Sequence, residues 1–141
     1  MRLRRRQDRL PAVRKILVGT DRSETATRAV RWAADMAGRY EAELIVTQTV
    51  REEMDKAATG RELEAYVADV VGPGTRTIVR DGSDPAKQMV EIAEEEKVDV
   101  LVVGSVGMSG RKEFLLENIP NRVSHLARCT VVIVRTQPAG S

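Results

Sequence analysis

Short apolar runs alternate with amphipathic segments over most of the chain, and this alternation constrains the fold more than any other feature. Three of the runs are continuously apolar, which is typical of strands covered on both faces in a parallel sheet. These three runs are residues 15–19, 98–104 and 130–135. Two further strands are predicted at residues 43–50 and 76–79.

Four amphipathic helices are predicted between these strands. Their inward-facing side chains recur at spacings of three and four residues, which places them on one stripe of each helix. In chain order they are Ala26, Ala29, Val30, Ala33, Ala37, Tyr40, Leu63, Tyr66, Val67, Val70, Ala86, Met89, Val90, Ala93, Val123 and Leu126. Asp84 and Pro85 suit the start of the third helix, and the fourth is predicted over residues 119–128, with Pro120 in its first turn. Gly60 is expected to separate the second helix from the residues before it.

The order β-α-β-α-β-α-β-α-β predicts one α/β domain, a doubly wound five-stranded parallel sheet flanked by four helices. We expect this domain to span residues 15–136, between a basic, disordered extension at 1–14 and a frayed tail at 137–141. In such sheets, ligands bind at the carboxyl ends of the strands, where the strand order reverses. The residues that follow each strand are therefore the candidate site.

Basic residues are concentrated at the amino end. Residues 1–15 hold seven Lys and Arg against one Asp, although the whole chain carries a formal charge of only +2. Contact of this extension with nucleic acid or an anionic membrane is one reading. No aromatic residue accompanies the charge to stack on bases, so we expect a solvated extension and no specific nucleic-acid partner. The apolar runs are too short for a membrane span, and the single cysteine, Cys129, favours the cytoplasm.

The segment "GSVGMSGRKEFLLEN", residues 104–118, follows the fourth predicted strand and combines glycines, hydroxyls and cations. Glycines let backbone N–H groups converge on phosphate oxygens. The side chains that could add hydrogen bonds and positive charge are Ser105, Ser109, Arg111 and Lys112. The glycine spacing is neither that of a P-loop nor that of a Rossmann motif. Taken alone, this segment is open to two readings, a phosphate loop and an ordinary turn.

The loop and its surroundings together resemble the universal stress protein family. Nucleotide-binding members of that family carry G-x-x-G, nine residues and then G-[S/T/N]. Gly104, Gly107 and Asn118 match this motif, whereas Glu117 stands in place of the third glycine. The segments 15–33, 82–116 and 118–135 also resemble the family's opening, middle and closing elements. The resemblance therefore extends over residues 15–135.

The resemblance implies an adenine-nucleotide alpha-hydrolase-like sandwich that binds an adenine nucleotide as a regulator. ATP is the expected ligand, with AMP, ADP and cyclic AMP as alternatives and Mg²⁺ only together with the nucleotide. The turn formed by Gly19, Thr20 and Asp21 would lie against the adenosine, and Thr49 would contact the adenine. The residues implied to hold the ribose and phosphates are Val103, Gly104, Gly107, Gly110, Glu117, Asn118 and Ile119. Asp21 is also suited to cap the first helix, and the two roles are compatible.

Glu117 is the departure from the family pattern that matters for affinity. A carboxylate about 5 Å from one phosphate charge costs about 3 kcal/mol at an effective dielectric near 20, which is about a hundredfold in affinity. We therefore expect weakened nucleotide binding. If Glu117 instead turned to solvent or reached a Mg²⁺ ion on the phosphates, the cost would be smaller.

Two other functions remain open from the sequence. One is a nucleotide-independent dimeric stress or adaptor protein, in which the loop survives for structural reasons. The other is a slow ATPase, but no acid–base pair or nucleophile set is apparent, so an enzyme is the less favoured reading. His125 and Cys129 are each the only residue of their type and are expected to be structural or at the surface. Dimerisation is a further expectation from the family, through the last strand between Thr130 and Arg135, since an apolar edge strand pairs readily with another chain.

Overall fold

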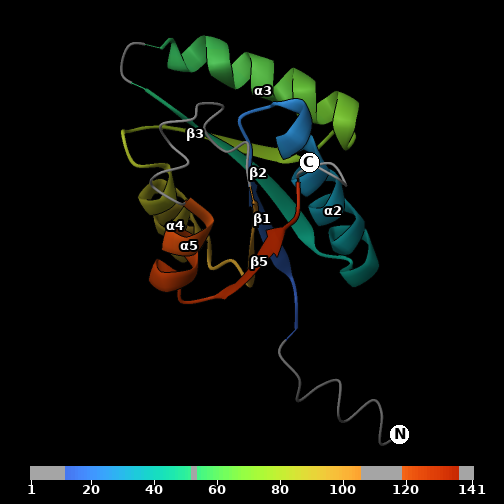
Figure 1. The fold of residues 1–141 in the computed structure, drawn as a ribbon. Coiled ribbons are helices and arrows are strands. Elements are labelled where there is room, and N and C mark those ends of the chain that lie inside the picture. Colours follow the sequence, from blue (N-terminus) through green and yellow to red (C-terminus); the bar gives the residue numbers. More distant parts are fainter. Residues whose placement is uncertain (1–11, 52–53, 106–118, 137–141) are drawn as a thin grey trace, which may run out of the picture.

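Five parallel strands form one sheet in the order β3-β2-β1-β4-β5. Figure 1 shows the sheet between its helices, with β3, β2, β1 and β5 labelled. The computed structural model describes residues 12–51, 54–105 and 119–136. In these residues the elements are β1 (Lys15–Gly19), α2 (Glu24–Tyr40), β2 (Glu43–Val50), α3 (Lys56–Val70), β3 (Arg76–Asp81), α4 (Pro85–Glu96), β4 (Val100–Gly104), α5 (Ile119–Leu126) and β5 (Thr130–Val134). The predicted fold class is confirmed. β3 extends two residues further than expected, and β4 begins two residues later.

The strand order reverses next to β1. The chain builds outward from β1 through β2 to β3, then returns to place β4 on the other side of β1 and β5 beyond it. Leu17 of β1 pairs with Ile45 of β2 and Leu101 of β4, all in parallel register. The carboxyl ends of β1 and β4 therefore lie side by side at the point where such sheets bind ligands.

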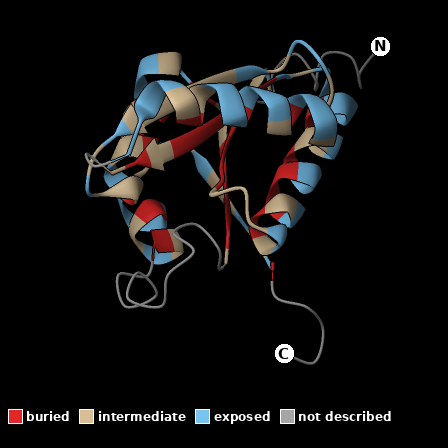
Figure 2. Cartoon of the chain, turned by 90° about the horizontal axis from the view of Figure 1, so that it is seen from above, coloured by how far each residue is buried: buried red, intermediate tan, exposed pale blue. Residues whose placement is uncertain are grey.

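Helices cover both faces of the sheet and enclose two apolar cores (Figure 2). On one face, α2 and α3 pack against Ile16 and Val18 of β1. On the other face, α4 and α5 pack against Leu17 of β1 and Val103 of β4. Successive residues of β1 thus enter opposite cores, which explains why the sequence of this strand is apolar without alternation.

The last run is covered on both faces only in part, since Val131 packs against one core and Val132 and Val134 against the other. β5 has a neighbour on one side only, β4, and its residues are half-buried or exposed. Ile133 has 47% of its surface exposed. α5 is short, and it ends at Leu126 instead of residue 128, so it leaves this part of the edge strand uncovered. Leu126, which was expected to be buried, is also exposed.

Two further helix predictions are corrected. Gly60 lies inside α3 and does not interrupt it, because Asp55 caps the helix through its bond to the N–H of Ala58. Tertiary packing outweighs the low helix propensity of glycine here, since the turns on either side of Gly60 bury Thr59 and Leu63. Tyr40 is exposed because it is the last residue of α2, beyond the core that the apolar stripe covers.

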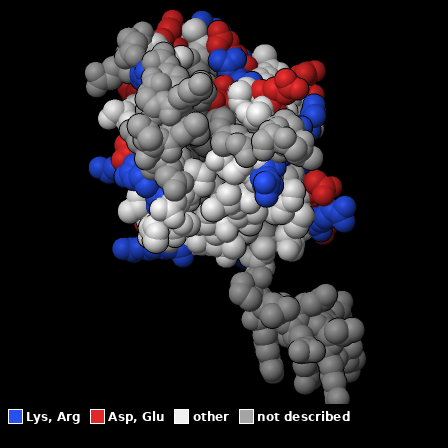
Figure 3. Space-filling model, viewed as in Figure 1, with Lys and Arg blue, Asp and Glu red and all other residues white. Residues whose placement is uncertain are grey.

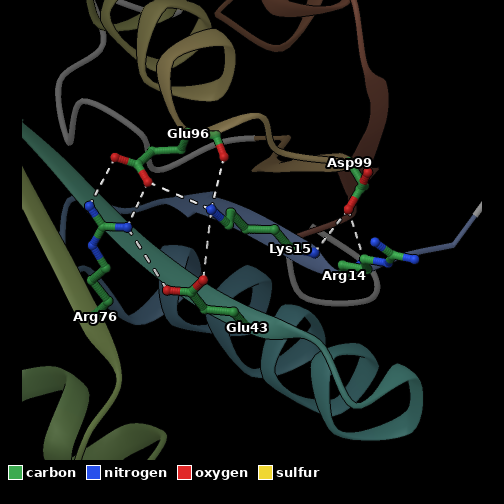
Figure 4. Close-up of polar contacts among 6 residues, drawn as sticks. All are labelled: Arg14, Lys15, Glu43, Arg76, Glu96 and Asp99. Atoms are coloured by element: carbon green, nitrogen blue, oxygen red, sulfur yellow. Dashed lines mark hydrogen bonds and ion pairs between the residues drawn. The ribbon is translucent and has the colours of Figure 1, made fainter.

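At the amino ends of the strands, charged side chains satisfy one another (Figure 4). The ammonium of Lys15 donates to the backbone oxygen of Glu96 at 2.9 Å and lies 3.8 Å from a carboxylate oxygen of Glu43. Arg76 donates to both carboxylate oxygens of Glu96, at 2.6 and 2.9 Å, and this pairing lowers the pKa of Glu96. Asp99 accepts the N–H of Lys15 at 3.0 Å. This edge therefore ties β1, β2, β3 and α4 together.

Candidate functional site

The candidate site lies at the carboxyl ends of β1 and β4. Val18 pairs with Val102, so the chain leaves the sheet at Thr20 beside Gly104. Thr20 is fully buried, and its N–H donates to the oxygen of Thr47 at 2.9 Å. The end of β1 is thereby fixed to β2 on one side and to β4 on the other.

Asp21 supplies the carboxylate of the candidate site. Its Oδ1 accepts the N–H of Ser23 at 2.9 Å, and Ser23 in turn caps α2 by accepting the N–H of Ala26 at 3.1 Å. The cap is therefore Ser23, and Asp21 supports it from the preceding turn. The other carboxylate oxygen, Oδ2, is buried and has no hydrogen-bond partner in the structure as described. A buried carboxylate oxygen without a donor is costly, so this atom is suited to accept an N–H or O–H from a ligand.

Thr49 extends the site along β2. Thr49 is half-buried. It lies two residues beyond Thr47, which pairs with Gly19, the last residue of β1. Thr49 therefore lies near the carboxyl end of the strand next to β1. Of the predicted residues, Thr20 and Asp21 form the turn after β1, and Thr49 lies on the neighbouring strand β2.

On the β4 side, the predicted site residues contribute backbone instead of side chains. Val103 is fully buried in the core under α4 and α5, and Ile119, the first residue of α5, joins the same core. Gly104 is the buried last residue of β4 and does not have a positive φ, so the left-handed freedom of glycine is not used there. The remaining predicted residues, Gly107, Gly110, Glu117 and Asn118, lie outside the described residues.

Ser105, near the start of the glycine segment (residues 104–118), is hydrogen-bonded to the last residues of the described chain. The N–H of Ser105 donates to the oxygen of Val134 at 2.8 Å, and the Ser105 hydroxyl oxygen accepts the N–H of Thr136 at 3.1 Å. The Ser105 hydroxyl was also a candidate donor to phosphate from the sequence. The structure shows that its oxygen already serves the chain's own backbone, beside the Thr136 hydroxyl at 3.3 Å.

Two residues at this edge were missed from the sequence. Arg22 donates through Nε to Oε1 of Gln48 at 2.9 Å, and Gln48 is only 7% exposed. A buried amide within the apolar strand "ELIVTQTV" was a visible signal that a polar partner must lie nearby. The unusual backbone of Arg22, with φ of 66°, had no signal in the sequence.

An ion pair fixes the start of α5 on α4. Arg122, in the first turn of α5, donates to both carboxylate oxygens of Asp84 at 2.5 and 2.9 Å. Asp84 is also the cap of α4, accepting the N–H of Lys87 at 3.3 Å, as predicted. The guanidinium of Arg122 is the main cause of the lowered pKa of Asp84. This pair therefore fixes α5, which begins at Ile119 directly after the glycine segment, against α4.

The other candidate groups do not form a site. His125 is exposed on α5, and Cys129 is half-buried, with a pKa raised mainly by burial. No cluster of three or more potential metal ligands occurs within the described ranges. Within the same ranges, none of the helices is long and apolar enough to span a membrane.

Comparisons with known proteins identify relatives of the whole domain. The sequence pattern of the universal stress protein family matches residues 12–135. Universal stress protein Rv1636 of Mycobacterium tuberculosis H37Rv is 33% identical, and the match covers 90% of this chain and 99% of that protein. A universal stress protein of Methanothermobacter thermautotrophicus is 34% identical, covering 87% of this chain and 96% of its own.

The solved structures agree with this fold. A crystal structure described as a universal stress protein in complex with cAMP superposes with a TM-score of 0.72 at 30% identity, covering 90% of this chain and all of that one. A universal stress protein of Archaeoglobus fulgidus, described as a complex with dAMP, superposes with a TM-score of 0.66 at 18% identity. It covers 89% of this chain and all of its own, and at that identity it supports the fold alone.

Proposed function

The chain belongs to the universal stress protein family, and we propose that it is a regulatory protein that binds an adenine nucleotide at the carboxyl ends of β1 and β4. The observation that carries this proposal is the buried, unpartnered Oδ2 of Asp21, which lies at the reversal of the strand order. This oxygen can accept a hydrogen bond from the exocyclic amino group of adenine. The relative described in complex with cAMP, at 30% identity over the whole domain, supports the same class of ligand.

The glycine segment is proposed to hold the ribose and phosphates, through Gly104, Gly107, Gly110 and Asn118, with Glu117 opposing the phosphate charge. The repulsion grows with the number of phosphate charges near the carboxylate. We therefore expect ATP to bind weakly, and cAMP or AMP, which carry fewer charges, to suffer less. Mg²⁺ would enter only with the nucleotide phosphates. We place the protein in the cytoplasm, with residues 1–14 and 137–141 as extensions outside the nucleotide-binding domain.

A calorimetric titration with cAMP, AMP and MgATP tests this function. Saturable heat with one nucleotide per chain is expected for at least one of the three, together with a rise in the melting temperature. The variant Glu117→Gly should bind MgATP at least about tenfold more tightly than the wild type. Absence of heat and of a thermal shift with all three nucleotides, in both proteins, would overturn the proposal in favour of a nucleotide-independent adaptor.

A homodimer through β5 is proposed on separate grounds. β5 is an edge strand with an exposed Ile133, and Figure 3 shows few charged side chains on the surface over it. An apolar edge strand with few charges readily pairs with another strand. Light scattering at micromolar concentration should give the mass of a dimer for the wild type and that of a monomer for Ile133→Lys. A monomeric wild type would contradict this part of the proposal.

Hydrolysis of ATP is the less favoured alternative. Asp21 is the carboxylate at the ends of β1 and β4, whereas Asp81 ends β3 and Asp84 caps α4, where it is paired with Arg122. Phosphate release above the level of a Gly104→Val variant would be required to support an enzyme.

A further inference from the structure

Arg22 has a backbone conformation that its position does not explain. Three non-glycine residues in the described ranges have a positive φ: Arg22, Glu41 and Lys97. Glu41 and Lys97 are the C-caps of α2 and α4, where a left-handed residue is ordinary. Arg22 ends no helix. A side chain makes this conformation unfavourable, so it persists only where surrounding contacts hold it.

Three contacts from Arg22 reach three different parts of the fold. Its N–H donates to the Thr20 hydroxyl oxygen at 2.9 Å, within the turn itself. Its Nε donates to Oε1 of the buried Gln48 in β2 at 2.9 Å. Its Nη2 donates to the carboxylate of Glu62 in α3 at 2.8 Å. We call these four residues the Arg22 clamp: Thr20, Arg22, Gln48 and Glu62.

Asp21 lies in the sequence between two residues of the clamp, Thr20 and Arg22. Thr20 is held to β2 by its backbone bond to Thr47, and Arg22 is held to β2 and α3 by its side chain. Asp21 lies between these two fixed residues, and its Oδ1 is held by the N–H of Ser23. The direction of Oδ2, the unpartnered oxygen, is therefore set by the turn that the clamp holds.

We propose that Arg22 is a positioning residue for ligand binding: it holds the β1–α2 turn so that Asp21 Oδ2 is oriented before the nucleotide arrives. This inference rests on the proposed function, since it is Oδ2 that we assign to the adenine. A group that is already oriented loses less conformational freedom on binding, and this raises affinity without adding a contact. Arg22 itself need not touch the nucleotide.

Two glycine variants test this role. Arg22→Gly removes the two side-chain contacts of the clamp and favours the same left-handed backbone. The relieved backbone offsets the loss of the donor to the buried Gln48, so the fold should be retained and the melting temperature should change little. Lys97→Gly is the matched control, because it relieves the same left-handed backbone conformation (φ of 55°) at the C-cap of α4, outside the β1–α2 turn. In titrations with cAMP, AMP and MgATP, Arg22→Gly should bind about tenfold more weakly than the wild type, and Lys97→Gly should bind like it.

The partner of Arg22 gives a second test. Gln48→Met keeps the length of the buried side chain and removes the acceptor of Nε, so it should also weaken binding. Because both substitutions break the same contact, the double variant should bind no more weakly than Arg22→Gly alone. Glu62→Gln should have a smaller effect, since the side chain of Glu62 is 58% exposed and its ion pair is screened by water.

Hydrogen exchange separates this inference from the proposed function. The Ser23 amide, bonded to Asp21 Oδ1, should exchange faster in Arg22→Gly than in the wild type, without any nucleotide present. Unchanged exchange at Ser23, or unchanged nucleotide affinity in Arg22→Gly, would overturn the positioning role while leaving the proposed function intact. A wild type that binds none of the three nucleotides would overturn both.

Discussion

The hydroxyl oxygen of Ser105 accepts the backbone N–H of Thr136 at 3.1 Å, across 31 residues of sequence. This contact joins the second residue of the glycine segment to the chain that leaves the edge strand β5. Thr136 has no exposed surface. The end of the domain thus holds the start of the proposed phosphate-binding segment.

Ser105→Ala should destabilise the fold, because it removes an acceptor from a fully buried residue. The expected loss is about 1–3 kcal/mol in the free energy of unfolding, measured by urea denaturation. Ser124→Ala is the control, since Ser124 is exposed and its hydroxyl donates to the backbone oxygen of Asn121, three residues away. Equal, small effects of the two substitutions would show that the Ser105 contact does not stabilise this end of the domain.

The ion pair between Asp84 and Arg122 should make stability depend on pH. The folded pKa of Asp84 is lowered from its ordinary value of 3.8, mainly by Arg122, so the pair stabilises the fold above that pH. The stabilisation is lost as the pH falls through the folded pKa. Asp84→Asn keeps the helix cap and removes the charge, so it should cost about 1 kcal/mol at pH 7 and progressively less as the pH falls below 3.8.

Asp35→Asn is the matched control for that experiment. Asp35 pairs with Arg39 on the exposed surface of α2, with both side chains more than half exposed. The cost at pH 7 should stay below about 0.5 kcal/mol. An Asp84→Asn variant that lost no more stability than Asp35→Asn, or lost it equally at pH 2, would refute the linkage.

Gly60→Ala should stabilise the protein by about 0.5–1 kcal/mol, because Gly60 lies inside α3 and has no need of glycine's freedom. A Cβ at this position would lie 4.0 Å from Cγ2 of Val79, an ordinary contact. Gly72→Ala should have the opposite sign, since Gly72 has a φ of 139°. Thermal unfolding of the two variants checks both signs, and a destabilised Gly60→Ala would mean that the helix does not run through residue 60.

Cys129 should react slowly with iodoacetamide in the native protein. Burial raises the pKa of the thiol, with a smaller contribution from the charges of Asp99 and Glu94, so less thiolate is present at any pH below that pKa. At pH 7.5 alkylation should be at least about tenfold slower than in urea-unfolded protein. Equal rates would show that the thiol is not shielded.

The arrangement of the sheet could be predicted from the sequence because it depends on patterns that several residues share. Continuously apolar runs such as "KILVG" are typical of strands covered on both faces of a parallel sheet, and helices that connect parallel strands form right-handed crossovers. Asp84 and Pro85 identified the start of α4 for the same reason, since a cap followed by proline is a local signal.

Other features could not be predicted because they depend on contacts between distant residues. Gly60 looked like a break, yet packing of α3 on the sheet keeps it helical. Tyr40 and Leu126 continue the apolar stripes of their helices, but each helix ends where the core ends. The clamp of Arg22 on Gln48 and Glu62 joins residues 26 and 40 positions apart, so no local pattern could reveal it.

The central claim is that Asp21 receives an adenine nucleotide through Oδ2, and the affinity of Asp21→Asn tests it most directly. Asparagine can still accept the Ser23 N–H through its side-chain oxygen, so the turn is retained while Oδ2 becomes an N–H₂ donor. Titrated with cAMP, AMP and MgATP beside the wild type, Asp21→Asn should bind at least about tenfold more weakly, at an unchanged melting temperature. Equal affinity of the two proteins would contradict the account.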